Sequence, residues 1–374
     1  MTNMKIIKYV CKIAVIFLCC LFLFCCKRIN NEDSGAIEKI SVNLKKVNQE
    51  LDISQFYNAT FIPLELTKKS QIGSIDKVIL SDNRIFVLDA TIAKKLFVFD
   101  MKGNFLKNIG KLGKGKGEYL VIRDFDVYDE KVYISSQQDN RMLIFDLEGQ
   151  HINDVKFSGY IGMSFMVLED GFVVNKTDGS NKAVTFYDKK GKKKKIITNP
   201  GFDFMRFSND HTFFKNLKGP FVYFAKNDTI YNIFEKNLKP SYFIDFGRKS
   251  VPYGKMKSIK ILEDFIKNND YLEYIYFNSF LKYYFLKVID GKYVYTIIID
   301  IQSKKLYNAM YLNYKGFTLL NPVGNTSDGP ILTWGPPSHA VYKVMSQKKN
   351  IFIPECFKES SINANPGVVI LTEK

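Results

Sequence analysis

The sequence predicts an all-β protein, a six-bladed β-propeller, and three observations support this fold class. The chain has 374 residues, 46% hydrophobic and 15% aromatic, which is too apolar for disorder and sufficient for a large core. An Asp-x-x-Gly motif recurs at Asp100, Asp146 and Asp188, at spacings of 46 and 42 residues. The strands around it are continuously apolar. A sheet covered on both faces by neighbouring sheets requires this pattern.

The repeated motif predicts a hairpin in each unit. Segments 96–103, 142–149 and 184–191 each read as a short apolar strand followed by Asp-x-x-Gly. Asp suits the first position of a type I turn, and glycine supplies the positive φ that closes the hairpin. Two further strands precede each hairpin, so the unit is four antiparallel strands in about 45 residues, the period of a propeller blade.

The rest of the chain supplies three more blades with weaker patterns. We expect a fourth blade from 211–246, a fifth from 274–312, and a sixth from 316–320, 331–334 and 368–372. Apolar residues at helical spacing predict a helical insertion over 255–271, between blades four and five, and a C-terminal helical excursion over 338–360.

The sixth blade has only three strands of its own. Near the N-terminus, the apolar segment 61–66 is a predicted strand that belongs to none of the other five blades. If this N-terminal strand completes the last blade, the ring closes and no open sheet edge remains. We therefore predict that the N-terminal strand closes the ring.

The N-terminus resembles an export signal. An apolar run from Ile13 to Phe24 follows three lysines, Lys5, Lys8 and Lys12. The run is shorter than the roughly 20 residues that a membrane-spanning helix needs. The domain prediction is a lipoprotein signal peptide over 1–25, a tether over 26–55 and the propeller over 56–374.

A cysteine pair follows the apolar run in place of a small-residue cleavage site. Leu23-Phe24-Cys25-Cys26 resembles a bacterial lipobox, and Cys26 is the predicted lipidation site because the residue before it is the smaller one. The alternatives are an ordinary signal peptide or a short uncleaved anchor. Acyl chains would hold the exported protein in the cell envelope, with the outer membrane as the expected location.

Charge and cysteine content exclude some classes of protein. The formal net charge is +16, which favours acidic partners, but the lysines are spread along the chain. Nucleic acid is not an expected partner, because no module of aromatic and basic residues is present. Cys356 is the only cysteine after residue 26, so no disulfide framework is predicted.

Two lysine-rich segments have structural interpretations. Residues 110–117 contain Gly-x-x-x-x-Gly-Lys, but Gly117 follows where a phosphate-binding loop needs Ser or Thr, and strands flank both sides. We interpret this segment as a connection between blades. Six lysines between Lys189 and Lys195 surround a hairpin, which we interpret as a solvated charged turn, with an anionic partner as the alternative.

Strand alternation predicts which residues share a rim of the propeller. Connections between blades and the loops between second and third strands lie on one rim. Arg, Tyr and a lone Trp on that rim suit recognition of a sugar or peptide, whereas packing of Trp334 between blades and pairing of Arg123 with Asp124 is the alternative. The candidate ligand-binding residues are Trp334, Arg123, Glu118, Tyr119, Asn140 and Arg141, with Gln137 beside them.

The pattern as a whole resembles a known family. The resemblance rests on Ile62-Pro63-Leu64, Ile72-Gly73-Ser74-Ile75, the hairpin at 99–103, the glycine-rich stretch 113–119, Asp124-Phe125-Asp126 and the closing segment 365–370. These residues resemble the six-bladed β-propeller lipoproteins of gut-type bacteria, relatives of NHL-repeat propellers. The resemblance implies the fold and brings no catalytic residues.

The leading functional prediction is a non-enzymatic binding or scaffold module for a glycan, peptide or partner protein. The alternative is a lyase or hydrolase at the channel mouth, for which His211 would be the best recruit to a metal. No metal ligands or cofactor are predicted from the spacing of His151, His211 and His339. Calcium in the central channel, held by Asp and backbone oxygens, is the remaining cation to consider.

Overall fold

The structure of the protein is a computed structural model. It describes residues 37–44, 47–159, 161–162, 164–176, 183–198, 212–224, 227–252, 259–268, 270–335, 352–358 and 364–374. Residues 1–38 form a unit separate from residues 39–374, and only the last two residues of that first unit are described. The unit from 39 to 374 holds the fold.

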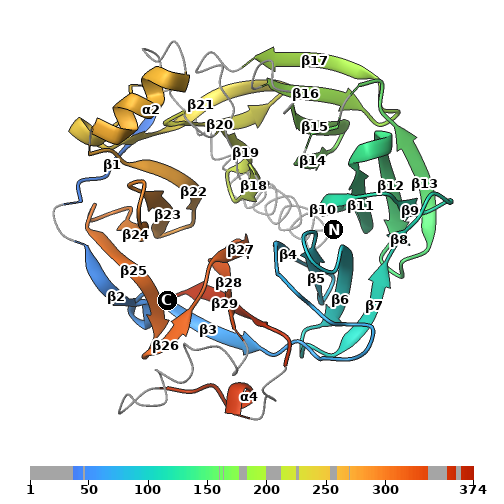
Figure 1. Ribbon diagram of the computed structural model, residues 1–374, viewed down its shortest axis with the longest axis horizontal. Coiled ribbons are helices and arrows are strands. Elements are labelled where there is room, and N and C mark those ends of the chain that lie inside the picture. The colour runs from blue at the N-terminus through green and yellow to red at the C-terminus, as the bar shows by residue number, and fades with distance from the viewer. Residues whose placement is uncertain are drawn as a thin grey trace, which may run out of the picture. The chain divides into compact units, whose positions relative to one another are not determined.

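Six sheets, each built on four antiparallel strands, surround a central axis, which confirms the predicted six-bladed propeller (Figure 1). Each of the first three blades is one continuous segment of chain. Their strands are β4 (Lys77–Ser81), β5 (Arg84–Asp89), β6 (Lys95–Asp100) and β7 (Phe105–Ile109); β10 (Ile122–Tyr128), β11 (Lys131–Ser136), β12 (Arg141–Asp146) and β13 (His151–Lys156); and β14 (Phe165–Leu168), β15 (Gly171–Lys176), β16 (Ala183–Asp188) and β17 (Lys193–Thr198).

The last three blades recruit strands from distant parts of the chain. The fourth contains β18 (Phe213–Asn216), β19 (Gly219–Tyr223), β20 (Thr229–Phe234) and β21 (Asn237–Asp245), extended by β1 (Glu38–Ser41). The fifth contains β22 (Glu273–Ser279), β23 (Tyr283–Ile289), β24 (Val294–Asp300) and β25 (Leu306–Tyr314), extended by β2 (Asn48–Asp52) and β26 (Phe317–Leu319). The sixth contains β27 (Pro322–Asn325), β28 (Pro330–Trp334), β29 (Gly367–Glu373) and β3 (Tyr57–Ile62).

The N-terminal strand closes the ring, as predicted. β3 pairs antiparallel with β29 along its whole length, from Val368 opposite Ile62 to Glu373 opposite Tyr57. The strand begins at Tyr57, four residues earlier than the predicted segment. The outermost position of the sixth blade is therefore filled by a strand from the other end of the chain.

Two boundary predictions need correction. The inner strand of the sixth blade is β27, whereas the predicted segment 316–320 lies largely in β26, which pairs back on β25. The reason is a reversal at Lys315 and Gly316, both of which have positive φ. The predicted tether over 26–55 also contains β1 and β2. Buried apolar side chains in and beside these strands, such as Ile40 and Leu51, join the core.

Helices contribute little to the described structure. The ten-residue α2 (Ile259–Asn268) lies in the chain between β21 and β22, where an insertion was expected. The four-residue α4 (Glu355–Lys358) is the described helical part of the expected excursion over 338–360, most of which lies outside the described residues. The fold is therefore all-β.

The Asp-x-x-Gly hairpins have the predicted geometry. Gly103 donates its N–H to the carbonyl of Asp100 at 3.0 Å, and the same bond forms at Gly149 and Gly191. Gly103 has φ +88°, and a Cβ there would lie 1.8 Å from the carbonyl oxygen of Pro63. Glycine is required at this position because both the backbone conformation and the close approach exclude a side chain.

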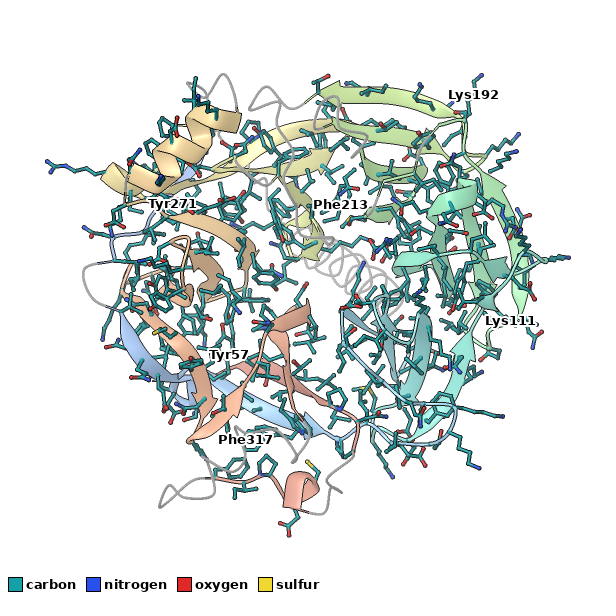
Figure 2. The ribbon with its side chains drawn as sticks, viewed as in Figure 1. Tyr57, Lys111, Lys192, Phe213, Tyr271 and Phe317 are labelled. Atoms are coloured by element: carbon teal, nitrogen blue, oxygen red, sulfur yellow. The ribbon has the colours of Figure 1, made fainter. Side chains whose placement is uncertain are left out.

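The core lies between the blades. Phe86, Phe125 and Phe145 belong to the cluster between blades one and two, and all three are 2% exposed or less. The sheets are therefore covered on both faces, as the continuous apolar strands predict. Phe213 points toward the middle of the ring, whereas Lys111 and Lys192 lie at its outer edge (Figure 2).

Candidate functional site

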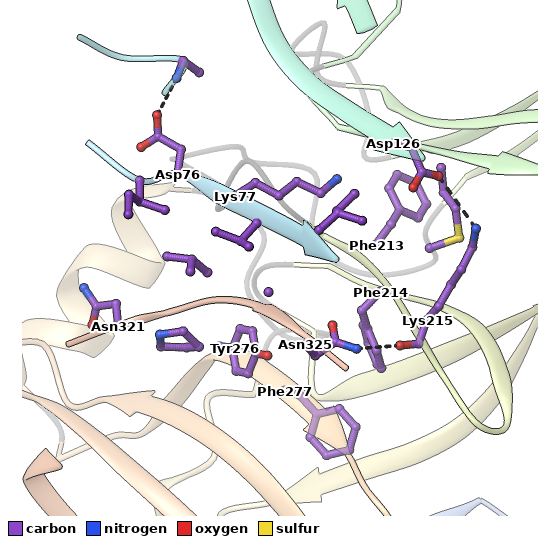
Figure 3. Close-up of a pocket in the computed structure, with 18 of the residues that line it drawn as sticks. Asp76, Lys77, Asp126, Phe213, Phe214, Lys215, Tyr276, Phe277, Asn321 and Asn325 are labelled. Atoms are coloured by element: carbon purple, nitrogen blue, oxygen red, sulfur yellow. Dashed lines mark hydrogen bonds and ion pairs between the residues drawn. The ribbon is translucent and has the colours of Figure 1, made fainter. Parts of the chain in front are cut away.

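A cavity of about 590 Å³ lies on the propeller axis. The innermost strands of all six blades, β4, β10, β14, β18, β22 and β27, each contribute to its wall (Figure 3). The cavity exists because six inner strands cannot approach the axis closely enough to fill it with side chains. Its volume lies within the range of small-ligand pockets.

The two ends of the cavity carry different residues. Asp76 and Asn321 precede or begin their inner strands, whereas Asp126, Lys215 and Asn325 lie toward the ends of theirs. Figure 3 places the two groups at opposite ends of the cavity. Val294 lines the cavity and is 36% exposed, so it marks a part of the wall that faces solvent.

Polar contacts cross the axis at the end that holds Lys215. The Lys215 amino group, from the fourth blade, donates to the carbonyl of Val167 at 3.3 Å and lies 3.8 Å from the Asp126 carboxylate. The Asn325 amide, from the sixth blade, donates to the backbone carbonyl of Lys215 at 2.9 Å. These contacts join four blades across one end of the cavity.

A buried ion pair joins the first two blades at the cavity wall. The Lys77 amino group lies 2.7 Å from Asp124 Oδ1 and donates to the carbonyl of Phe125, also at 2.7 Å. Asp124 is completely buried, and its second oxygen accepts the N–H of Phe165 from the third blade at 3.1 Å. The charge of Lys77 is therefore balanced inside the protein.

The two carboxylates that line the cavity are engaged in structural hydrogen bonds. Asp76 Oδ2 accepts the N–H groups of Ala90 and Thr91 at 2.7 and 3.2 Å. Asp126 accepts the N–H of Val127 on its own strand and the N–H of Val167 on the next blade, at 2.9 and 2.8 Å. These carboxylates hold loops and blades together.

The other two basic side chains of the wall lack a carboxylate partner among the described residues. The Lys287 amino group donates to Asn321 Oδ1, and burial lowers the pKa of this lysine to about 8. Arg123 has a buried Nε without a hydrogen-bond partner in the described structure. Among the described residues, no carboxylate is therefore paired with these two basic groups of the cavity wall.

Aromatic side chains form the apolar part of the wall. Phe214 packs edge-on against Phe277 with ring centroids 6.0 Å apart, and Phe213 is 8% exposed. Tyr276 lies near them (Figure 3), and burial raises its pKa to about 12. A ring-shaped ligand can pack against such a wall while polar groups orient it.

Of the predicted rim residues, Arg123 is the one that lines the cavity. Trp334 is only 2% exposed and packs with ring centroids 5.6 Å from Phe61 and 6.5 Å from Phe317. Its indole also covers Gly367, where a Cβ would lie 2.2 Å from the ring. This burial favours the alternative interpretation of the sequence, in which Trp334 packs between blades.

Glu118, Asn140 and Arg141 are brought together, but away from the axis. The Arg141 guanidinium binds Asp139 and Asp154 at 2.5 and 2.8 Å and donates to the carbonyl of Glu118 at 3.1 Å. Asn140 Oδ1 accepts the N–H of Ile161 at 3.2 Å.

Tyr119, which follows Glu118 on the short strand β9 (Glu118–Tyr119), is completely buried. Its hydroxyl donates to the carbonyl of Lys94 at 3.1 Å. This bond ties Tyr119 to the first blade, whereas Arg141 and Asn140 make contacts within the second blade and with the segment that leads to the third.

The predicted glycine-rich connection has the expected character. Residues 110–117 join the first blade to the second and contain no helix, so the requirement of a phosphate-binding loop for a following helix is not met. Glu118 pairs with Lys111 at 3.1 Å and accepts the N–H of Gly115. The N–H of Gly115 and the amino group of Lys111 both stabilise the carboxylate and so lower the pKa of Glu118.

Potential metal ligands do not cluster in the described part of the chain. No group of three His, Cys, Asp or Glu side chains there is arranged to hold a metal ion. His151 pairs with Asp154 at 2.6 Å in the network around Arg141. His211 and His339 lie outside the described residues.

No helix within the described ranges is long and apolar enough to cross a membrane. The predicted signal peptide and Cys26 lie outside those ranges.

The lysines of the cavity, Lys77, Lys215 and Lys287, were not among the predicted site residues. The sequence does carry a signal for Lys77, because this charged residue begins an inner strand that is otherwise largely apolar. Lys287 lies on a second strand, so its position in the sequence gives no indication that it reaches the axis.

The fold and the cavity define the class of this protein, a six-bladed β-propeller with an axial pocket. Residues 37–372 match the model of a domain family of unknown function, DUF4934, and the chain belongs to this family. No curated protein matches the chain.

Two solved structures from Bacteroides show the same fold. One, from Bacteroides fragilis, is a protein predicted to be exported; it is 18% identical with a TM-score of 0.73, over 90% of this chain and 99% of that one. The other, a member of the DUF4221 family from Bacteroides vulgatus, is 9% identical with a TM-score of 0.51, over 85% and 96% of the two chains.

Proposed function

We propose that this protein is an exported, lipid-anchored binding module that takes a small ligand, such as a glycan or peptide end, into its axial cavity. The observation that carries the proposal is the cavity itself. It combines an aromatic wall around Phe213 and Phe277 with basic groups at Arg123 and Lys287. Ligand sites typically combine an apolar surface with a few polar groups that orient the ligand.

The contacts across one end of the cavity favour a ligand that enters from the other end. Lys215 joins the second, third and fourth blades, and Asn325 adds the sixth. A polymer threaded through the channel would have to break these bonds. A single sugar residue or a chain terminus would not.

Lipid attachment through Cys26 would hold the propeller at the bacterial cell envelope, with the outer membrane as the expected location. The support is the basic start and short apolar run before Cys25 and Cys26. We expect metabolic labelling with an alkyne fatty acid to mark the full chain. Cys26→Ser should remove the label and Cys25→Ser should retain it. Loss of label in Cys25→Ser alone would move the anchor to Cys25.

The binding function is tested by filling the cavity. The full chain would be screened by titration calorimetry against neutral and acidic monosaccharides, disaccharides and short peptides. Val294→Trp places a bulky ring on the solvent-facing part of the wall. This variant should reduce the affinity of any binder by at least about tenfold. Tyr293→Trp, at the neighbouring exposed position, is the matched control.

Two outcomes separate this proposal from others. Binding that survives Val294→Trp unchanged would place the site outside the cavity and contradict the proposal. The enzyme alternative of the sequence analysis, a lyase or hydrolase, predicts that the bound glycan or peptide is converted, so each binder would also be incubated and checked for products.

A further inference from the structure

We propose that the axial cavity recognises an acidic group of its ligand, with Arg123 and Lys287 as the residues that bind it. This inference rests on the proposed binding function and adds the chemical class of the ligand. The class is a ring-shaped molecule, such as a sugar, that carries a carboxylate or sulfate.

Basic side chains outnumber carboxylates among the described residues of the cavity wall. Among the described residues that line it are four basic side chains and two carboxylates. Lys77 is paired with Asp124, and Lys215 lies beside Asp126. Arg123 and Lys287 have no such partner in the described structure, so they are the two basic residues that an acidic ligand could pair with.

The carboxylates in and beside the cavity wall are held by hydrogen bonds to the backbone. Asp124 and Asp126 both accept backbone N–H groups of the third blade, and Asp76 holds the loop at Ala90. Moving any of them toward Arg123 or Lys287 would break hydrogen bonds that join parts of the propeller. An acidic ligand supplies the countercharge without this cost.

Arg123 and Lys287 come from opposite sides of the ring. Arg123 lies on β10 of the second blade and Lys287 on β23 of the fifth, which are opposite each other in the ring (Figure 1). Both side chains line the same cavity. An acidic group between them is approached from two sides, and a guanidinium can bind both oxygens of a carboxylate.

The environment of Lys287 also fits an anion. Its amino group has the neutral amide oxygen of Asn321 as its hydrogen-bond partner, which compensates its charge only weakly. Burial lowers its pKa to about 8, so the amine is charged at pH 7 and becomes neutral above that value. A bound anion would stabilise the charged form, and binding would weaken as the pH rises through this range.

The test uses three ligands that share a pyranose ring, namely glucose, glucuronate and glucose 6-sulfate, titrated calorimetrically into the full chain at pH 7. We expect the two acids to bind at least about tenfold more tightly than glucose, which is the effect of one charge-assisted hydrogen bond. Arg123→Gln and Lys287→Met should each remove most of this preference. Lys193→Met, on the exposed β17, should leave it unchanged.

A pH series gives a second, independent readout. In the unaltered protein, the affinity for glucuronate should fall between pH 7 and pH 9. In Lys287→Met the fall should be absent, because the titrating amine is gone. Thermal melting of each variant at pH 7 would verify that it is folded.

Several outcomes would overturn the inference. Equal binding of glucose and both acids would exclude recognition of an acidic group and leave the proposed binding function intact. An acid preference that persists in both variants would place the acidic group elsewhere. Absence of binding by both acids at millimolar concentration would also overturn it, whatever neutral ligand the cavity accepts. A preference for one acid would identify the group as carboxylate or sulfate.

Discussion

The two halves of the ring use different interactions to hold neighbouring blades together. In the first three blades, buried carboxylates join one blade to the next, as when Asp124 binds Lys77 of the first blade and the N–H of Phe165 in the third. In the last three, the contacts between blades include aromatic clusters, with Trp334 and Phe317 in one and Tyr242 and Phe277 in another.

The difference teaches that a propeller needs contact between blades and not one particular chemistry. Aromatic clusters lie between blades in both halves, as at Phe125 and Phe145, and the carboxylates of Asp124 and Asp126 add polar contacts in the first half. In the second half, strands from the N-terminus add apolar side chains such as Tyr57 and Phe61 to one of the clusters.

The aromatic half is tested most strongly at Trp334. We expect Trp334→Ala to lower the free energy of unfolding by about 3–5 kcal/mol, because a large buried ring is removed between Phe61 and Phe317. Denaturant unfolding followed by circular dichroism would measure the change. Phe234→Ala is the matched control, since Phe234 is 59% exposed and should lose little stability.

A small effect at Trp334 would mean that the ring is not packed as the structure places it. The same variant also tests its predicted ligand role. Correctly folded Trp334→Ala should bind any cavity ligand as the unaltered protein does, because the indole does not line the cavity.

Buried carboxylates in the two halves should respond oppositely to neutralisation. Asp124→Asn should destabilise the protein by about 3 kcal/mol, because Lys77 loses its partner inside the protein. Asp228, which directly precedes β20 of the fourth blade, has acidic neighbours instead. Burial, Glu273 and Asp245 raise its pKa to about 7, so Asp228→Asn should stabilise the protein at pH 8 by about 1–2 kcal/mol.

The pH dependence gives the sign of the Asp228 effect directly. The folded protein keeps the proton on Asp228 up to about pH 7, whereas the unfolded chain releases it near pH 3.8. Its contribution to stability is therefore present at low pH and lost as the pH rises through about 7. Denaturant unfolding at pH 5 and pH 8 should show this fall in the unaltered protein and less of it in Asp228→Asn. An equal fall in both would contradict the assignment.

The repeats that were clear in the sequence were the ones stabilised by local interactions. Gly103 and its equivalents follow from a turn that needs positive φ, so their spacing could be read without the fold. The sixth blade was harder, because the reversal at Lys315 and Gly316 sends β26 back to the fifth blade. A turn is local, but the choice of strand partner after it depends on distant residues.

The candidate site followed the same division. Arg123 was predicted on a rim from the order of strands, and the structure places it in the cavity wall. Trp334 was assigned to a ligand because a sequence does not tell a buried ring from an exposed one at the end of a strand.

The sequence by itself determined the propeller, the number of blades and the closure by the N-terminal strand, because apolar runs and turn residues act over a few neighbouring positions. Only the tertiary structure decided that β1 and β2 join blades and that Arg123 and Lys287 face one cavity without carboxylate partners in the described structure. The physical reason is that burial and charge pairing depend on which distant segments meet. Closure of the ring brings together residues more than 160 positions apart.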